Sequence, residues 1–296
     1  MTIINNKLKG SLLVAVSALF YASYGLWSKL MAGHFGEFNQ AWSRALILLV
    51  VLIPYGLLTK NFKKIQRKDL KWFLVVSFSG GLNQAPYFFG FENLTIGTAT
   101  LLFYLALVLG AYLIGKFFFR EKFTKVKYFS LFISLIGLFI IYKFALNAGQ
   151  IPAAVLTMTA GFMGASVVVF SKKISGNYSE LQIICGFLIV MLFANFPLSL
   201  IFNESLPRLS FTQPWLAQTG YLLTMLLANI AAVSGFKYLE PSIGGLIGLL
   251  EIIFASLFGI IFFHDSLTFQ LVLGSFLIIL AASVNDLFTA LKKSAN

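Results

Sequence analysis

Long apolar runs recur along this sequence from one end to the other. One of them, residues 245–263, is nineteen residues long and contains a single ionisable side chain, Glu251. A helix rises about 1.5 Å per residue, so roughly 20 apolar residues cross the ~30 Å hydrocarbon core of a bilayer. Only 11% of the residues are charged, against about 25% in soluble domains. The sequence therefore predicts a helical membrane protein with many spans.

The runs predict an all-α protein with ten transmembrane helices and short connections. The predicted spans are 10–32, 40–58, 71–91, 95–118, 126–143, 150–171, 181–202, 214–236, 242–263 and 268–288.

Basic residues collect on one side of this predicted topology. With the N-terminus in the cytoplasm, 18 of the 22 Lys and Arg residues fall in inner segments, as the positive-inside rule requires. Both termini are therefore expected to be cytoplasmic. The net charge of +12 follows from these loops, so we expect the lipid bilayer as a partner and no nucleic acid.

Reactive side chains are sparse. Cys185 is the single cysteine, and the two histidines, His34 and His264, fall in loops. The sequence has neither an H-E-x-x-H nor a G-x-S-x-G motif, and no phosphate-binding G-x-x-x-x-G-K-[ST] loop, which argues against zinc, serine-nucleophile and ATP chemistry. We expect no metal, no cofactor and no enzymatic activity.

Two matching segments indicate an internal duplication. Ser28-Lys29 and Ser171-Lys172 are 143 residues apart, and "FFFREKFT" matches "IFFHDSLT" 144 residues later. These offsets predict two five-helix repeats, 1–146 and 147–296. Because five is odd, the second repeat enters the membrane inverted, a design common among transporters.

The quoted motifs resemble those of the drug/metabolite transporter superfamily, in its ten-span form with two EamA-like repeats. The likeness is strongest in residues 236–284, with Glu251, Asp265 and Gly274 at family positions, and Arg44 matches an arginine of span two. Ile252 stands where the family has a proline. The resemblance implies a central cavity lined by spans one to four and six to nine, with spans five and ten outside.

It further implies a secondary transporter that moves a small polar or amphipathic metabolite by alternating access. We favour an amino acid or amine-type substrate, and the resemblance favours export. Protons are a candidate coupling ion. The expected location is the bacterial cytoplasmic (inner) membrane, as a monomer or homodimer.

Glu251 is the leading candidate site residue. Gly244, Gly248 and Ala255 lie on its side of the helix, and small residues favour contact with other helices over lipid. A charge at mid-membrane costs at least about 2.5–3.5 kcal/mol, so such residues are paired, hydrated or protonated. We predict that Glu251 binds substrate or a proton; the alternative is a hydrogen-bonded packing residue.

The other candidates for substrate binding or coupling are polar or aromatic residues within spans. Amides inside spans three and eight suit a water-filled cavity, although interhelical hydrogen bonds explain them equally. Aromatic residues of spans one, three and four suit a cage for a ring or amine, or simple packing. Arg44 attracts a carboxylate from the substrate or from a neighbouring helix. Besides Glu251 and Arg44, the set contains Asn83, Gln84, Tyr87, Asn229, Tyr24, Trp27 and Tyr104.

Three other functional classes compete with a carrier. A channel would need polar filter loops or rings from several subunits, and an intramembrane enzyme would need paired catalytic groups. A membrane scaffold without transport activity leaves no distinguishing motif.

Overall fold

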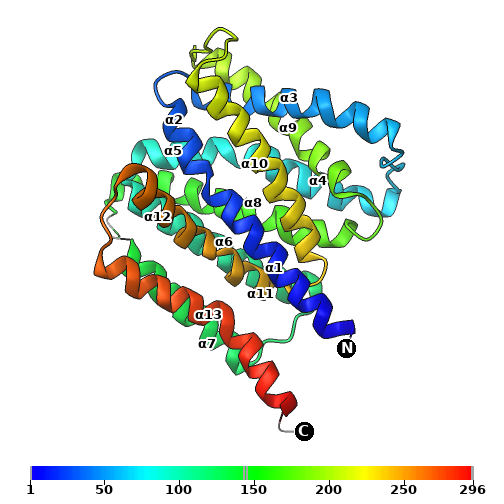
Figure 1. Cartoon of the computed structure of the whole chain (residues 1–296), viewed down its shortest axis with the longest axis vertical. Helices are drawn as coiled ribbons and strands as arrows, with labels where there is room; N and C mark the ends of the chain where they lie inside the picture. Colours follow the sequence, from blue (N-terminus) through cyan, green and yellow to red (C-terminus); the bar gives the residue numbers. More distant parts are fainter. Residues whose placement is uncertain (1, 143, 145, 295–296) are drawn as a thin grey trace.

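The computed structural model describes residues 2–142, 144 and 146–294, and within them all regular secondary structure is helical (Figure 1). Residue 143, where the fifth predicted span ends, lies outside this part. The elements are α1 (Thr2–Ala22), α2 (Tyr24–Met31), α3 (Glu37–Leu58), α4 (Arg67–Leu82), α5 (Gln84–Asn93), α6 (Ile96–Phe119), α7 (Lys125–Ile141), a 3-10 turn η1 (Ala148–Gln150), α8 (Ile151–Ile174), α9 (Glu180–Ile201), α10 (Gln213–Phe236), α11 (Pro241–Gly248), α12 (Leu250–Phe263) and α13 (Phe269–Ser294).

Within the described residues, seven helical segments are long and apolar enough to cross a membrane. The predicted all-α membrane protein is confirmed at this level, while the number of ten crossings stays a prediction. The seven segments are Asn6–Met31, Glu37–Leu58, Ile96–Phe119, Ala148–Ile174, Glu180–Ile201, Gln213–Phe236 and Pro241–Phe263, and a shorter apolar helix covers Phe269–Val284.

Three pairs of consecutive helices meet end to end, at Ser23, Asn83 and Leu249. The Ser23 hydroxyl donates to the Phe20 carbonyl at 2.7 Å, which locally tightens the chain. Three residues after Asn83, Pro86 has no N–H to donate. The third break needs no proline, because the Leu249 N–H bonds the Leu246 carbonyl at 3.1 Å, three residues back. The ninth predicted span is thus interrupted although it lacks the family proline.

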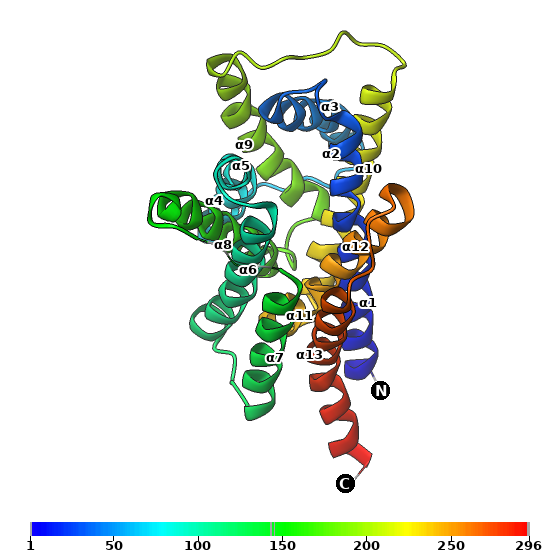
Figure 2. The same ribbon diagram turned by 90° about the vertical axis from the view of Figure 1, so that its left-hand side faces the viewer.

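The first half of the chain packs mainly against the second half. Neighbouring pairs include α3 with α9, α1 with α10, α6 with α8 and α7 with α13 (Figure 2). In the last pair two glycines allow close approach, since a Cβ on Gly137 would lie 2.8 Å from the Gly274 carbonyl oxygen. Small residues at such crossings let helix backbones come together in a membrane.

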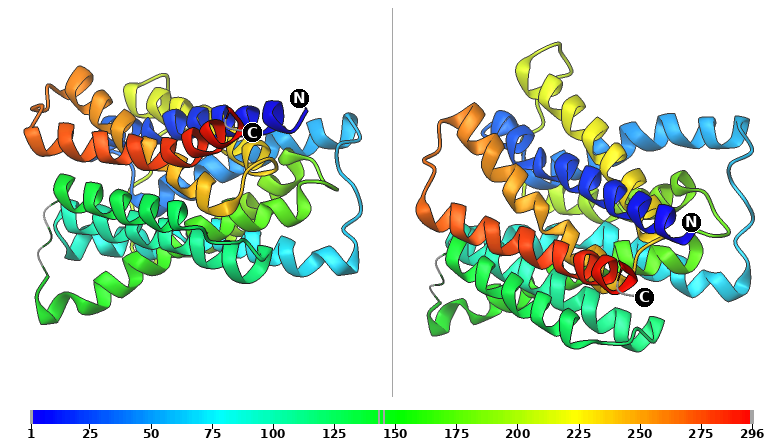
Figure 3. Two further views of the ribbon diagram at one scale, coloured as in Figure 1. Left: turned by 90° about the horizontal axis from the view of Figure 1, so that it is seen from below. Right: turned by 60° about the horizontal axis from the view of Figure 1, so that its bottom comes forward.

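The helices run between two ends of the molecule (Figure 3). We call the end that holds both chain termini the terminal end; the connections 59–66 and 120–124 lie there too. The 3-10 turn η1 and the connection 264–268 lie at the opposite end. Between the ends, large apolar side chains such as Val50, Phe132 and Phe193 are exposed on the flanks, as a lipid-facing surface requires.

Candidate functional site

Glu251 lies in the first turn of α12, directly after the break at Leu249. Its side chain is half-buried, and the Tyr104 hydroxyl of α6 lies close enough to its carboxylate to interact with it. Backbone N–H groups at a helix N-terminus also favour a negative charge. The break therefore places the carboxylate where helix dipole and hydroxyl both stabilise it.

One side of Glu251 faces open space. A Cβ on Gly248 would meet no atom within 4 Å, and Ala255 is exposed. Further along the same face, Gly244 packs against Phe236. The small-residue face predicted to contact other helices does so at Gly244, whereas beside Glu251 no other helix packs on Gly248.

Aromatic side chains surround the carboxylate in two groups. In the first, Tyr24 packs on Tyr21 with ring centroids 5.4 Å apart and stacks on Tyr221 at 4.4 Å. In the second, Phe103 contacts Tyr87 at 4.4 Å and Tyr104 at 5.3 Å. All five tyrosines of the two groups interact electrostatically with Glu251. Glu251 thus lies between an α1/α2/α10 group and an α5/α6 group.

Arg44 of α3 adjoins the first aromatic group. Its guanidinium lies 3.6 Å from the centroid of the Tyr221 ring, and Nη1 donates to Gln218 Oε1 at 3.2 Å. The side chain is 2% exposed. Five predicted residues therefore belong to the two tyrosine groups or adjoin them: Glu251, Tyr24, Tyr104, Arg44 and Tyr87.

Other predicted residues make ordinary structural contacts. Trp27 donates to the Ser23 hydroxyl at 3.1 Å and packs over Gly220 of α10. Asn229 accepts from the Tyr21 hydroxyl at 3.0 Å and donates to the Met225 carbonyl at 2.8 Å, joining α1 to α10.

The two amides at the α4/α5 break adjoin the second aromatic group through the backbone, since the Tyr87 N–H donates to the Asn83 carbonyl at 3.3 Å. Gln84 donates at 3.4 Å to the carbonyl of Glu37, at the start of α3. Asn83 is half-buried, and within the described residues neither side-chain amide hydrogen-bonds to Glu251. Their role as ligands stays a prediction.

The candidate set lacked Tyr21, Tyr221 and Gln218. Gln218, Tyr221 and Asn229 share one face of α10, at helical spacings of three and eight residues. That polar stripe on an otherwise apolar span was the available signal.

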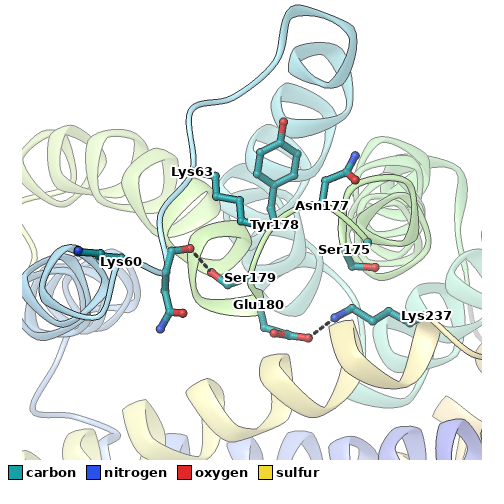
Figure 4. Close-up of a pocket in the computed structure, with 10 residues that line it drawn as sticks. Lys60, Lys63, Ser175, Asn177, Tyr178, Ser179, Glu180 and Lys237 are labelled. Atoms are coloured by element: carbon teal, nitrogen blue, oxygen red, sulfur yellow. Dashed lines mark hydrogen bonds and ion pairs between the residues drawn. The ribbon is translucent and has the colours of Figure 1, made fainter.

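A separate pocket of about 270 Å³ opens at the terminal end (Figure 4). Its walls include Lys60, Lys63 and Ser179, and Glu180 pairs with Lys237 at 2.5 Å across it. None of the predicted site residues lines this pocket. It lies among loops rather than beside Glu251.

Comparison of the sequence with known proteins finds matches among transporters. The sequence model of the EamA-like transporter family matches twice, over residues 8–143 and 151–285. The riboflavin transporter ImpX of Fusobacterium nucleatum subsp. nucleatum is 28% identical over 185 residues, which cover 57% of this chain and 60% of that protein. A crystal structure of another protein, 15% identical, superposes with a TM-score of 0.80 over 94% of this chain and 96% of that one. At that identity the likeness shows the shared fold.

Proposed function

The chain belongs to the EamA-like transporter family, and from that premise we propose that it is a ten-span secondary carrier of a small polar or amphipathic metabolite. Two inverted repeats, close to 1–146 and 147–296, exchange roles to expose a central site to each side in turn. The termini lie in the cytoplasm and the protein resides in the bacterial inner membrane.

The packing pattern supports the repeats. At an offset of 143–144 residues, α3 corresponds to α9 and α7 to α13, and these corresponding helices pack on each other. The packing of α1 on α10 corresponds to the packing of α8 on α4 and α5. The packing of α6 on α8 corresponds to the packing of α11 and α12 on α1. Exchanging the halves reproduces most of the packing, as a two-fold axis between inverted repeats would.

The position of Glu251 supports a substrate site at this place. Its side chain is half-buried between two aromatic groups, with open space beside it. A carboxylate accepts hydrogen bonds, and tyrosine rings offer flat faces. We therefore favour a substrate with an N–H donor and an aromatic ring. An aromatic amine or amino acid meets this description, and so does riboflavin, the substrate named for the ImpX relative.

Transport by reconstituted protein tests the proposal. Vesicles containing the wild-type chain should exchange internal labelled substrate for external substrate, which a carrier does and a scaffold does not. A panel of riboflavin, tryptamine and tryptophan separates the substrate classes. Failure of all three to bind or exchange would contradict the proposal.

Replacing the central carboxylate gives the first prediction. Glu251→Gln should lower transport by about 10- to 100-fold, because one hydrogen bond to a charged group contributes roughly 1.5–3 kcal/mol. Glu92→Gln, which changes an exposed acid of α5, is the matched control and should transport normally. Wild-type rates and an unaltered pH profile in Glu251→Gln would remove both the binding and the proton-coupling role.

A further inference from the structure

Arg44 is a buried cation without a carboxylate partner. No Asp or Glu oxygen of the described residues lies within 4 Å of it, and its Nε has no hydrogen-bond partner. Glu37, seven residues earlier, is exposed and acts on the guanidinium only at longer range. Burying a charge without a partner carries a high free-energy cost, so the site requires an explanation.

The surroundings of Arg44 hold it in one orientation. Gln218, which is fully buried, donates its amide to the Gln40 carbonyl at 2.9 Å and to the Ser43 hydroxyl at 2.8 Å. These two bonds turn the amide oxygen of Gln218 toward the guanidinium. The Tyr221 ring supports one face of the guanidinium at 3.6 Å. The plane of the arginine is thus fixed while most of its N–H donors are left unused.

A second unused donor lies beside it. The Tyr24 hydroxyl is buried without a hydrogen-bond partner, and the Tyr24 ring stacks on the same Tyr221 ring that the Arg44 guanidinium contacts. Buried polar groups normally find partners, so two unused donors at one place indicate a missing acceptor.

We propose that Arg44 binds a planar oxygen acceptor of the substrate, either a carboxylate or the paired carbonyls of a heterocyclic ring. This inference rests on the proposed function and specifies its substrate class. The guanidinium fork matches two coplanar oxygens, and the Tyr24 hydroxyl supplies a further donor. Tyr24 and Tyr221 each interact with both Arg44 and Glu251. The substrate therefore spans an acceptor-binding end at Arg44 and a donor-binding end at Glu251.

Ligand selectivity of purified variants tests this assignment. In Arg44→Gln, affinity should fall at least about tenfold for ligands that carry the acceptor, and tryptamine, which has none, should bind as in wild type. Loss of tryptophan binding identifies a carboxylate, and loss of riboflavin binding identifies ring carbonyls. Arg208→Gln, in the exposed 202–212 connection, is the control and should bind all ligands as wild type does.

A structural role for Arg44 makes a different prediction. It would lower thermal stability while leaving the relative affinities of the three ligands unchanged, and that result would overturn the inference. Should Arg44→Gln fail to fold, Arg44→Lys keeps the charge without the planar fork and should still weaken acceptor-bearing ligands selectively. If the wild-type protein binds no ligand of the panel, the proposed function fails and this inference with it; normal binding by both variants overturns this inference alone.

Discussion

Ion pairs hold the terminal end of the molecule together, whereas the described residues of the opposite end form none. At the terminal end the Glu121 carboxylate accepts from Lys127 Nζ at 2.6 Å and from the backbone N–H of Ser242, at the start of α11, at 3.3 Å. Lys127 also pairs with Glu240 at 2.7 Å. Asp265, which corresponds to Glu121 in the second half, makes no ion pair with a described residue.

The helix packing also differs between the two parts of the ninth span. α11 packs against α6, α1 and α13, whereas α12 packs mainly against α1. Glu251 and Tyr104 lie where these two paths separate. Under the proposed alternating access, the difference between the ends predicts that the substrate enters this conformation from the opposite end and that transport requires the terminal ion pairs to break.

Cross-linking tests this comparison with the largest expected effect. In a Cys185→Ser background, a bifunctional thiol reagent should join Lys122→Cys to Glu240→Cys, since both residues adjoin Lys127 Nζ, and should stop transport. The corresponding pair at the opposite end, Ile96→Cys with Ser266→Cys, should react more slowly. The reactions are followed by gel mobility and flux.

Equal cross-linking rates at the two ends would contradict the assignment. A cross-linked terminal end with normal flux would show that this end does not need to open.

Breaking the buried pair gives the next largest effect. The Glu121 and Lys127 side chains are 2% and 7% exposed, and removing one partner of a buried pair costs about 3–5 kcal/mol. Glu121→Gln should therefore lower the free energy of unfolding and make the terminal end more reactive to thiol reagents. Asp265→Asn, the counterpart change, should stay within about 0.5 kcal/mol. Similar losses in both variants would mean that the two ends do not differ.

The smallest effect is expected at the half-exposed pair. Glu180 and Lys237 have side chains 25% and 27% exposed, and pairs of this kind contribute about 0.2–1 kcal/mol. Glu180→Gln should lower the melting temperature slightly, and added salt should reduce the difference. Lys63→Gln, at an exposed lysine of the same pocket, should have no effect. A loss as large as that of Glu121→Gln would place the main closure here instead.

Single spans were predicted more accurately than the site they build. The predicted spans 95–118 and 214–236 correspond to Ile96–Phe119 and Gln213–Phe236, because apolar length alone sets them. Pro86 signalled the α4/α5 break, but nothing local signals the break at Leu249, which depends on packing against other helices. Likewise Gln218 and Tyr221 matter through the arginine they face, and which helix faces meet is a tertiary property that no single span encodes.

The distribution of contacts between the halves has a consequence for synthesis. Arg44 is oriented by Gln218, 174 residues later in the chain, and α3 and α7 likewise pack on helices made afterwards. The ribosome therefore delivers the first half into the membrane with a charged side chain and a helix-packing surface that have no partner yet. The insertion machinery must shelter this intermediate until the second half emerges, so pausing translation near the middle of the chain should be especially harmful to yield.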